Sequence, residues 1–517
     1  MIFLYFDNNK SQLNLMYIPG FIILFLLVLC PAIAAAKGDL LIRNVTLVSP
    51  ERDEPIHNID VLIRSGYIQE IGRQIENKAG VKVLEASGLY LTPGLIDSHV
   101  HVYHATGLKR RYTENFDSLY DAYLKQAPRS FLYFGYTSVI ELNSNPRANQ
   151  NFKAASHHPR LFHCGHGLAL DDGFMSLEFE DDGFAKRFPH YLHVPDSNRP
   201  TPDGDDLANH TPEQSVASLI EDGAICIKLY YEEALWFPGG PPPFRLPSQA
   251  LIKDVVRAAH SNNVPVLLHA TTPSGHRIAL TTGVDIAAHG LWEWPNVGYE
   301  IEQPPETITA LIDEQAAAGL KIQPTMRTIR NTQSMFDAEF LKSPLLKHVL
   351  PTEYLDYLRG PGQAQRSAFL SMFGALIVPD ANPDVVGDRL ETFNTRYERL
   401  IKRFSDKGGG LLLGTDTAVG GFGWGSPPGL SGYLEMLSWE RAGIPLRTIF
   451  RAATLDNAKA FGLEDQLGTI EPGKRADLLL LADNPLIEIS AYNTIKTIVV
   501  DGLPIDRQVL SASKPKL

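Results

Sequence analysis

Two histidines one residue apart end a hydrophobic run in the stretch LTPGLIDSHVHVYHA, residues 91–105. Alternate side chains of a β-strand leave on the same face, so His99 and His101 are expected to point together from Cα atoms about 6–7 Å apart. Neutral imidazoles are common ligands of divalent metal ions. The pair alone is a weak signal, because strand histidines are more often hydrogen-bonded core residues than ligands, so other parts of the chain must decide between the two interpretations.

Further polar residues stand in or after later apolar segments, in AICIKLYY, LLHA, AAHG and GTDT. They are Lys228, His269, His289 and Asp416. A lysine buried among apolar residues is unfavourable unless a partner neutralises or coordinates it. Together with the first two histidines, these side chains form a set of nitrogen and oxygen ligands suited to Zn²⁺ or a similar divalent ion.

The segments that carry these residues alternate with helical patterns. Strand-like runs recur at YTSVIEL, RLFHCGHG, AICIKLYY, PVLLHAT, VDIAAHG, KIQPTM and LLLGTDT, and the run before His99 makes eight. Patterns such as SQALIKDVVRAAHSNN and PETITALIDEQAAAG separate most of them. We predict an α/β fold, a (β/α)8 TIM barrel over residues 91–467, with its active site at the carboxyl ends of the strands. An insertion over residues 327–408 follows the seventh strand, and loops of this length often act as lids or specificity elements.

Both ends of the mature chain read as strands. DLLIRNVTLVSP and NIDVLIRSGYIQEIG lie near the N-terminus, and GTIEPGKRADLLLLADNP and TIKTIVVDGLPI lie near the C-terminus. Pro-Gly and Asp-Gly turn signals separate the C-terminal runs. We therefore expect a small β-sandwich domain built from residues 37–90 and 468–517.

Residues 1–36 are predicted to be a signal peptide. Ile18 to Leu29 is almost wholly apolar, and Ala34-Ala35-Ala36 fits the small-x-small pattern that signal peptidase cleaves. The apolar run is shorter than the roughly 20 residues of a membrane span, although an uncleaved anchor is one alternative. A lipid anchor on Cys30 is another, but Leu29 is bulky where lipoprotein signals normally carry a small residue. The prediction is an exported protein, periplasmic or secreted, with no stable membrane span after cleavage.

Composition limits the partners and the means of stabilisation. Of 517 residues, 44% are hydrophobic and 21% charged, which is typical of a globular protein. The formal net charge is −12 and no Lys/Arg-rich run is present, so nucleic acid is not an expected partner. Cys164 and Cys226 are expected to be buried apolar side chains rather than a disulfide framework. A small-molecule substrate is expected, and the sequence leaves homo-oligomerisation open.

The ordered set of PGLIDSHVH, IKLYY, LLHA, AAHG, GTDT and the tail AATLDNAKAFGLEDQLGTIEPGKRADLLLL resembles the amidohydrolase superfamily. The similarity is greatest to its binuclear members close to imidazolonepropionase-like and prolidase-like dipeptidases, and it covers nearly the whole mature chain. The resemblance implies two divalent metal ions, with Zn²⁺ as the expected identity. The implied ligands are His99, His101 and Asp416 for the more buried ion, and His269 and His289 for the second.

Lys228 is implied to bridge both ions after carboxylation by CO₂. A carbamate turns an unfavourable buried ammonium into an anionic ligand that two cations stabilise. The alternative is a neutral lysine whose pKa is lowered by burial.

The implied reaction is hydrolysis of an amide-like C–N bond in a dipeptide, an N-acyl amino acid or a cyclic amide. Two metal ions lower the pKa of a shared water, giving a bridging hydroxide, and polarise the substrate carbonyl. Asp416 is placed to take the proton of this water and return it to the leaving amine. The alternatives are a lactone or ester hydrolase with the same site, and a non-catalytic binding barrel.

Four residues are candidate substrate contacts. Tyr230 and Tyr231 follow Lys228, where a phenol would donate to a carbonyl oxyanion, and ordinary packing is the alternative. Arg327 and Arg330 follow the seventh strand and would bind a substrate carboxylate, and a solvated helix face is the alternative. Weaker candidates, for which local hydrogen bonding is the simpler interpretation, are Asp97, His104, Glu141, His163 and His166.

Overall fold

The computed structural model describes most of the chain beyond the predicted signal peptide. The described residues are 38–77, 79–110, 113–178, 181–197, 199–201, 203–233, 244–298, 300–337, 339–367, 383–418 and 423–513. The predicted signal peptide, residues 1–36, lies outside them, as does part of the predicted insertion.

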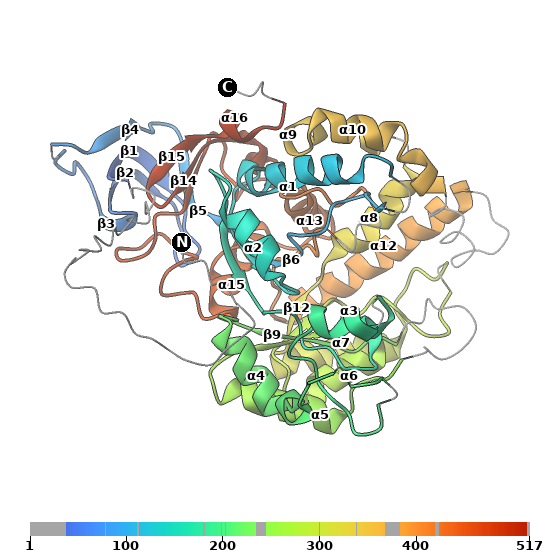
Figure 1. Ribbon diagram of the computed structural model, residues 1–517. Helices are drawn as coiled ribbons and strands as arrows, with labels where there is room; N and C mark the ends of the chain where they lie inside the picture. The colour runs from blue at the N-terminus through green and yellow to red at the C-terminus, as the bar shows by residue number, and fades with distance from the viewer. Residues whose placement is uncertain are drawn as a thin grey trace, which may run out of the picture. The chain divides into compact units, whose positions relative to one another are not determined.

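Strands from the two ends of the chain share one sheet (Figure 1). The N-terminal strands are β1 (Leu40–Leu47), β2 (Ile56–Arg64), β3 (Tyr67–Gly72), β4 (Lys82–Glu85) and β5 (Tyr90–Pro93), and the C-terminal strands are β13 (Leu478–Leu481), β14 (Ile495–Val500) and β15 (Leu503–Asp506). Their order is β15-β14-β13-β5-β1-β2-β3, with β4 beside β1. The antiparallel pairing of β5 with β13 joins the two ends. The inward side chains of these β-branched and leucine-rich strands form a separate apolar core.

Seven further strands form two parallel sheets. They are β6 (Leu95–Val100), β7 (Tyr136–Glu141) and β8 (Arg160–His163) in one sheet, and β9 (Ile227–Tyr230), β10 (Val266–His269), β11 (Ile286–Ala288) and β12 (Lys321–Gln323) in the other. The helices between them are α1 (Phe116–Tyr133), α2 (Pro146–Lys153), α3 (Asp181–Arg187), α4 (Pro212–Glu221), α5 (Gln249–His260), α6 (Pro273–Thr282) and α7 (Glu306–Ala318), with the short η2 (Phe174–Glu178) and η3 (Leu207–His210). Parallel pairing requires such crossover connections, and it brings the carboxyl ends of the strands together.

Backbone hydrogen bonds connect the two parallel sheets between β8 and β9. Ile225 N donates to His163 O at 2.9 Å, and Leu168 N donates to Lys228 O at 2.7 Å. These bonds place the loop after β8 beside the strand that carries Lys228.

A disulfide bond crosses the same junction. Cys164 and Cys226 are completely buried, as predicted from the sequence. However, they are bonded to each other and are not free thiols. The expectation of two free apolar cysteines was therefore wrong. The two residues are 62 positions apart in sequence, and only the adjacency of β8 and β9 brings their Cα atoms to 4.4 Å.

Residues 411–417 lie between β12 and β6 on the other side. Leu412 N donates to Ile322 O of β12 at 2.9 Å, and Ser98 N of β6 donates to Leu413 O at 3.0 Å. The segment was predicted to be the eighth strand, and it makes parallel bridges to both neighbours instead of a continuous ladder. The positive φ of 56° at Asp416 interrupts the extended backbone.

The described part of the predicted insertion, residues 327–408, is helical. It contains most of α8 (Met326–Phe336), then η4 (Phe340–Lys342), α9 (Leu346–Val349), α10 (Thr352–Arg359) and α12 (Pro383–Asp406). The chain continues through α13 (Leu430–Arg441), α14 (Leu446–Ala452) and α15 (Leu455–Ala460), and after β13 through η6 (Ile489–Thr494) and, last, α16 (Arg507–Leu510). Glu398 of α12 binds Arg330 of α8 and Arg441 of α13, which ties the three helices together.

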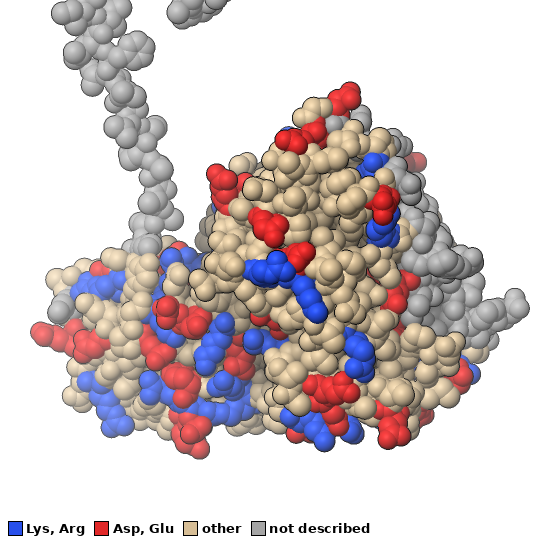
Figure 2. Space-filling view, turned by 90° about the horizontal axis from the view of Figure 1, so that it is seen from below, with Lys and Arg blue, Asp and Glu red and all other residues tan. Residues whose placement is uncertain are grey.

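Charged side chains of both signs are interspersed over the face seen in Figure 2. This mixture agrees with the lack of a Lys/Arg-rich run in the sequence. Among the described residues, no helix has both the length and the apolar character needed to cross a membrane.

Candidate metal centre

His99, His289 and Asp416 each bring a potential ligand atom to within 4.8 Å of the others. His99 belongs to β6, His289 directly follows β11, and Asp416 lies in the segment between β12 and β6. All three residues are buried. Two imidazoles and a carboxylate that converge inside a protein form a donor set typical of a divalent metal site.

His101 shares the Asp416 carboxylate with His99. Oδ1 of Asp416 lies 3.0 Å from Nε2 of His101 and 3.3 Å from Nε2 of His99. The two histidines thus converge on one oxygen, as expected for alternate positions of an extended chain. The other ring nitrogen of His101 donates to Oε1 of Glu141 at 3.1 Å. Glu141 ends β7, is completely buried, and also accepts from the Asn143 amide, so its carboxylate is held in place.

A second pair of imidazoles meets beside this group. Nδ1 of His269 and Nε2 of His289 lie 3.1 Å apart. The outer nitrogens of both rings have other partners: Nε2 of His269 donates to Glu232 at 2.8 Å, and Nδ1 of His289 is hydrogen-bonded to the Thr325 hydroxyl at 2.7 Å. The two inner nitrogens therefore face each other.

Lys228 on β9 has an amine without a hydrogen-bond partner in the described part of the chain. Its side chain is 2% exposed and Nζ is completely enclosed. Burial lowers the pKa of Lys228 to about 7, although the negative charge of Asp416 acts in the opposite direction. An orphaned buried amine beside a cluster of histidines is unfavourable, and coordination or covalent modification would remove the penalty.

The electrostatics differ between members of the group. Burial by itself would lower the pKa of His101, but its hydrogen bonds to Asp416 and Glu141 raise that pKa to about 9, so a metal ion would have to displace its proton. Burial lowers the pKa of His99 to about 3, so its imidazole is neutral at physiological pH. Burial by itself would raise the pKa of Asp416, but the neighbouring imidazoles of His99 and His101, which donate to its carboxylate, hold it well below the usual value. Neutral imidazole and ionised carboxylate are the states that coordinate metal.

The backbone around Asp416 is strained and braced. Asp416 adopts φ 56°, a region that residues other than glycine rarely occupy, and its amide donates to His99 O at 2.8 Å. The preceding Thr415 donates through both its amide and its hydroxyl to the buried carboxylate of Asp97. Burial raises the pKa of Asp97 to about 7, and the hydrogen bonds from Thr415 and the His99 amide lessen the shift. Such over-determined strain is typical of functional positions.

Tyr230 ends β9, and Tyr231, which follows it, points to the opposite side of the chain. Tyr230 shares the face of Lys228, and its ring centroid lies 5.9 Å from Nζ of that lysine and 6.2 Å from the His269 ring. Tyr231 packs into the core against Gly275 of α6. The structure therefore brings Tyr230, but not Tyr231, to the histidines, because successive side chains of an extended chain point to opposite sides.

Arg327 and Arg330 are engaged within the helical insertion. Arg327 donates to Gly425 O at 2.8 Å and to the Ser334 hydroxyl at 2.7 Å, and Arg330 donates to Glu398 at 2.7 Å. These contacts hold α8 against its neighbours, and the structure does not bring either guanidinium to the histidine group. Burial also lowers the pKa of Arg327, to about 9.

The weaker candidates divide in the same way. Glu141 and Asp97 contact the histidine group directly, as described above. The ring of His104 lies 5.9 Å from that of His101, and His166 is paired with Arg187 at 3.2 Å. His163 accepts from the Gly165 amide through its own ring nitrogen.

Several contacts of the site are absent from the sequence analysis. Glu232 and Thr325 hold the outer nitrogens of two histidines, and Phe174 of η2 and Trp292 place aromatic rings 6.0 Å from His269 and 5.0 Å from His289. Of these residues, only Glu232 could have been found from the sequence, because it belongs to the acidic pair Glu232-Glu233 directly after IKLYY. Thr325 follows β12, Trp292 follows β11 and Phe174 begins η2, and the strand pattern does not predict that their side chains meet the histidines.

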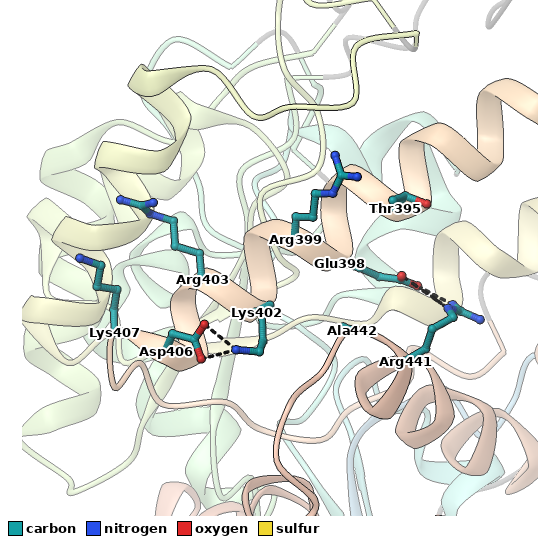
Figure 3. Close-up of a pocket in the computed structure, with 9 residues that line it drawn as sticks. All are labelled: Thr395, Glu398, Arg399, Lys402, Arg403, Asp406, Lys407, Arg441 and Ala442. Carbon is teal, nitrogen blue, oxygen red and sulfur yellow. Dashed lines mark hydrogen bonds and ion pairs between the residues drawn. The ribbon is translucent and has the colours of Figure 1, made fainter.

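A charged groove elsewhere on the molecule contains none of the predicted ligands. It lies between α12 and α13, has a volume of about 550 Å³, and is lined by residues such as Lys402, Arg403, Asp406 and Arg441 (Figure 3). Lys402 pairs with Asp406 and Arg441 with Glu398 inside the groove, and Arg403 pairs with Asp313 outside its lining, so these cations already have acidic partners.

Comparison with known families identifies the family of the chain and its fold. Residues 90–292 and 366–505, more than half of the chain, match the amidohydrolase family. A dihydroorotase of Ruminiclostridium cellulolyticum is 24% identical over 295 residues, which are 53% of this chain and 63% of that protein. A dihydroorotase of Trichlorobacter lovleyi is 32% identical over 119 residues, 23% of this chain and 25% of that protein. The chain thus matches less than two thirds of the length of these curated relatives.

Solved structures match over most of the chain. A Xaa-Pro dipeptidase with bound methionine has a TM-score of 0.58 and 21% identity, covering 91% of this chain and 100% of that one. Phenylurea hydrolase B has a TM-score of 0.60 and 18% identity, covering 93% and 99%. At these identities the likeness shows the fold alone, an α/β fold of the TIM-barrel type. With the family model matched over more than half of the chain, the conclusion is that this chain belongs to the amidohydrolase family.

Proposed function

We propose that the protein hydrolyses an amide-like C–N bond in a dipeptide, an N-acyl amino acid or a cyclic amide, using two divalent ions, Zn²⁺ in the native state. The observation that carries this proposal is the convergence of His99, His289 and Asp416 to within 4.8 Å, beside the facing nitrogens of His269 and His289. The six proposed ligand residues are His99, His101, Lys228, His269, His289 and Asp416.

The proposed ligands divide into two sets. Asp416 and the two histidines of β6 would hold the first ion, and His269 and His289 would hold the second. Lys228 would bridge them as a CO₂-derived carbamate, which its enclosed and unpartnered amine supports. The lowered pKa of Lys228, about 7, supports this further, because CO₂ reacts with the neutral form of an amine.

Asp416 is the proposed proton shuttle. When bound, the ions would supply an activated water and polarise the scissile carbonyl. The Asp416 carboxylate, kept ionised by its imidazole neighbours, would accept the proton of that water and return it to the leaving amine. Tyr230, on the same strand face as Lys228, is the proposed contact to the substrate carbonyl.

The relatives and the aromatic residues narrow the substrates to be tested. The structural likeness to a Xaa-Pro dipeptidase supports dipeptides, and the partial matches to dihydroorotases support cyclic amides. Phe174 and Trp292, which lie against two of the proposed ligands, favour an apolar group beside the scissile bond.

We also propose how the strands close into domains and where the protein is located. We take the two parallel sheets and residues 411–417 as one closed (β/α)8 barrel, and the sheet from both termini as a β-sandwich domain; the hydrogen bonds at both junctions support this. We also take the protein to be exported after cleavage near Ala36. The disulfide between Cys164 and Cys226 supports export, because disulfides persist in oxidising compartments.

The test is a metal analysis and a substrate panel on purified protein. Metal-replete protein should contain about two ions per chain, by the two-metal logic of such sites, and should hydrolyse at least one member of a panel of Xaa-Pro and other dipeptides, N-acyl amino acids and cyclic amides. Lactones and esters belong in the same panel. Turnover of esters or lactones alone would show that the protein is an ester or lactone hydrolase and not an amide hydrolase. A protein that binds no metal when purified in excess Zn²⁺ would contradict the proposal as a whole.

A further inference from the structure

We infer that Glu232 is a positioning residue that fixes His269 for the second metal ion. This inference rests on the proposed metal centre. The Glu232 carboxylate accepts from Nε2 of His269 at 2.8 Å, and Glu232 is only 4% exposed. A carboxylate on one nitrogen of a ligand histidine sets the ring's orientation, fixes its tautomer and makes the other nitrogen a stronger donor.

The contact determines which atom of His269 is available. A proton on Nε2, donated to Glu232, leaves Nδ1 with its lone pair, and Nδ1 is the atom that lies 3.1 Å from Nε2 of His289. Two nitrogens bound tetrahedrally to one Zn²⁺ at about 2.0–2.1 Å would lie about 3.3 Å apart. The observed separation of 3.1 Å is close to that value, so a Zn²⁺ ion would require little change in the spacing of the two nitrogens.

The backbone explains why Glu232 reaches this ring. β9 pairs with β10 so that Tyr230 lies opposite His269, and the amide of Tyr231 donates to His269 O at 2.9 Å. Glu232 follows directly at the end of the same strand that carries Lys228. One short segment therefore bears both the proposed bridging lysine and the carboxylate that orients a ligand of the second ion.

The first ion has a matching arrangement. Glu141 accepts from Nδ1 of His101 at 3.1 Å, while Nε2 of the same ring faces Asp416. Each proposed ion would thus have one histidine backed by a buried glutamate. In contrast, His289 is backed by a threonine hydroxyl, which is a weaker electrostatic partner.

Neighbouring carboxylates provide a matched control. Glu293 is hydrogen-bonded to the Thr271 hydroxyl at 2.9 Å, and Glu233 accepts from Thr272 and Ser274. Among these three acidic residues, the described contacts join only Glu232 to a histidine. Replacing Glu293 changes another acidic side chain, whose pKa burial raises to about 8, at the same end of the strands and leaves the contact with His269 intact.

The experiment measures metal binding directly. Wild-type, Glu232→Gln and Glu293→Gln proteins are stripped, reloaded with Zn²⁺ or Co²⁺, and equilibrated against a graded series of chelator concentrations, with stoichiometry by elemental analysis and the Co²⁺ absorption spectrum as a second readout. We expect Glu232→Gln to lose one of two ions at about 10–100-fold lower chelator strength than wild type. Glu293→Gln should retain both ions as wild type does, and melting of the metal-free proteins verifies that each variant is folded.

Each outcome has a defined meaning. Retention of both ions by Glu232→Gln at wild-type affinity, equal weakening of both ions, or an equal loss in Glu293→Gln would overturn the inference. Failure of the wild-type protein to bind metal would instead overturn the proposed function. If Glu232→Gln does not fold, Glu232→Asp is measured in the same way, and a second ion held as tightly as in wild type would count against the inference.

Discussion

The carboxylate of Asp416 lies 3.0 Å from Nε2 of His101, and this contact joins the first parallel strand to the last segment of the parallel-strand region. The same oxygen lies 3.3 Å from His99, so one carboxylate organises both histidines of the sequence motif. Its ionised state depends on these neighbours, since burial alone acts against the charge.

Replacing Asp416 with Asn should lower kcat by about 10²–10⁴-fold, the usual contribution of a positioned proton-transfer group. Asn keeps the shape of the side chain but cannot accept the proton of water. Steady-state kinetics and metal content are measured on the same preparation. Asp406→Asn, which removes an exposed carboxylate of α12, should have the activity of wild type. Full activity of Asp416→Asn with both ions bound would contradict the assigned role.

Lys228→Ala should abolish activity and weaken metal binding, because it removes the proposed bridging group. The cavity left behind should admit a short carboxylate, so acetate or propionate should restore part of the activity. In wild type, ¹³C-labelled bicarbonate should produce a carbamate carbon signal in the NMR spectrum, which Lys228→Ala lacks. A fully active wild-type protein without that signal would show that Lys228 acts as a neutral amine.

Removing the disulfide should destabilise the fold by about 2–4 kcal/mol, the usual range for a native disulfide. It closes a loop between residues 62 positions apart and crosses the junction between β8 and β9. Denaturant unfolding of a Cys164→Ala, Cys226→Ala double variant provides the measurement. A reductant should lower the stability of wild type and leave that of the double variant unchanged; an equal response of both proteins would argue against the bond.

Stability should fall with rising pH through the titration of Glu435. Burial raises the pKa of Glu435 from 4.5 to about 7, against hydrogen bonds from Trp439 and from the amides of Met326 and Arg327. The folded state therefore binds the proton more tightly than the unfolded state, and the proton's contribution to stability is lost as the pH rises from about 5 to 8. The loss at this one site amounts to about 2 kcal/mol.

The variant Glu435→Gln isolates this contribution, because an amide does not titrate. Its lost hydrogen-bond acceptor adds a destabilisation that is constant with pH. Denaturant unfolding at pH 5, 6, 7 and 8 should therefore show the difference in unfolding free energy between wild type and variant moving by about 2 kcal/mol in favour of the variant. A difference that stays constant over this range would disprove the titration.

The sequence alone determined features that depend on local periodicity and composition. Alternation along an extended chain placed His99 and His101 on one face, and the order of polar residues after apolar runs picked out Lys228, His269, His289 and Asp416. Their metal-binding roles remain predictions. The same patterns indicated that both ends of the chain form strands, which the shared sheet contains.

Only the tertiary structure decided which side chains meet across elements. The bond between Cys164 and Cys226 and the contact of Glu232 with His269 depend on strand neighbours that no local pattern specifies. Arg327 illustrates the opposite case: it has suitable chemistry, but its helix directs it into the insertion. The physical reason is that periodicity determines the face on which a side chain lies, whereas its partner depends on how distant segments pack in three dimensions.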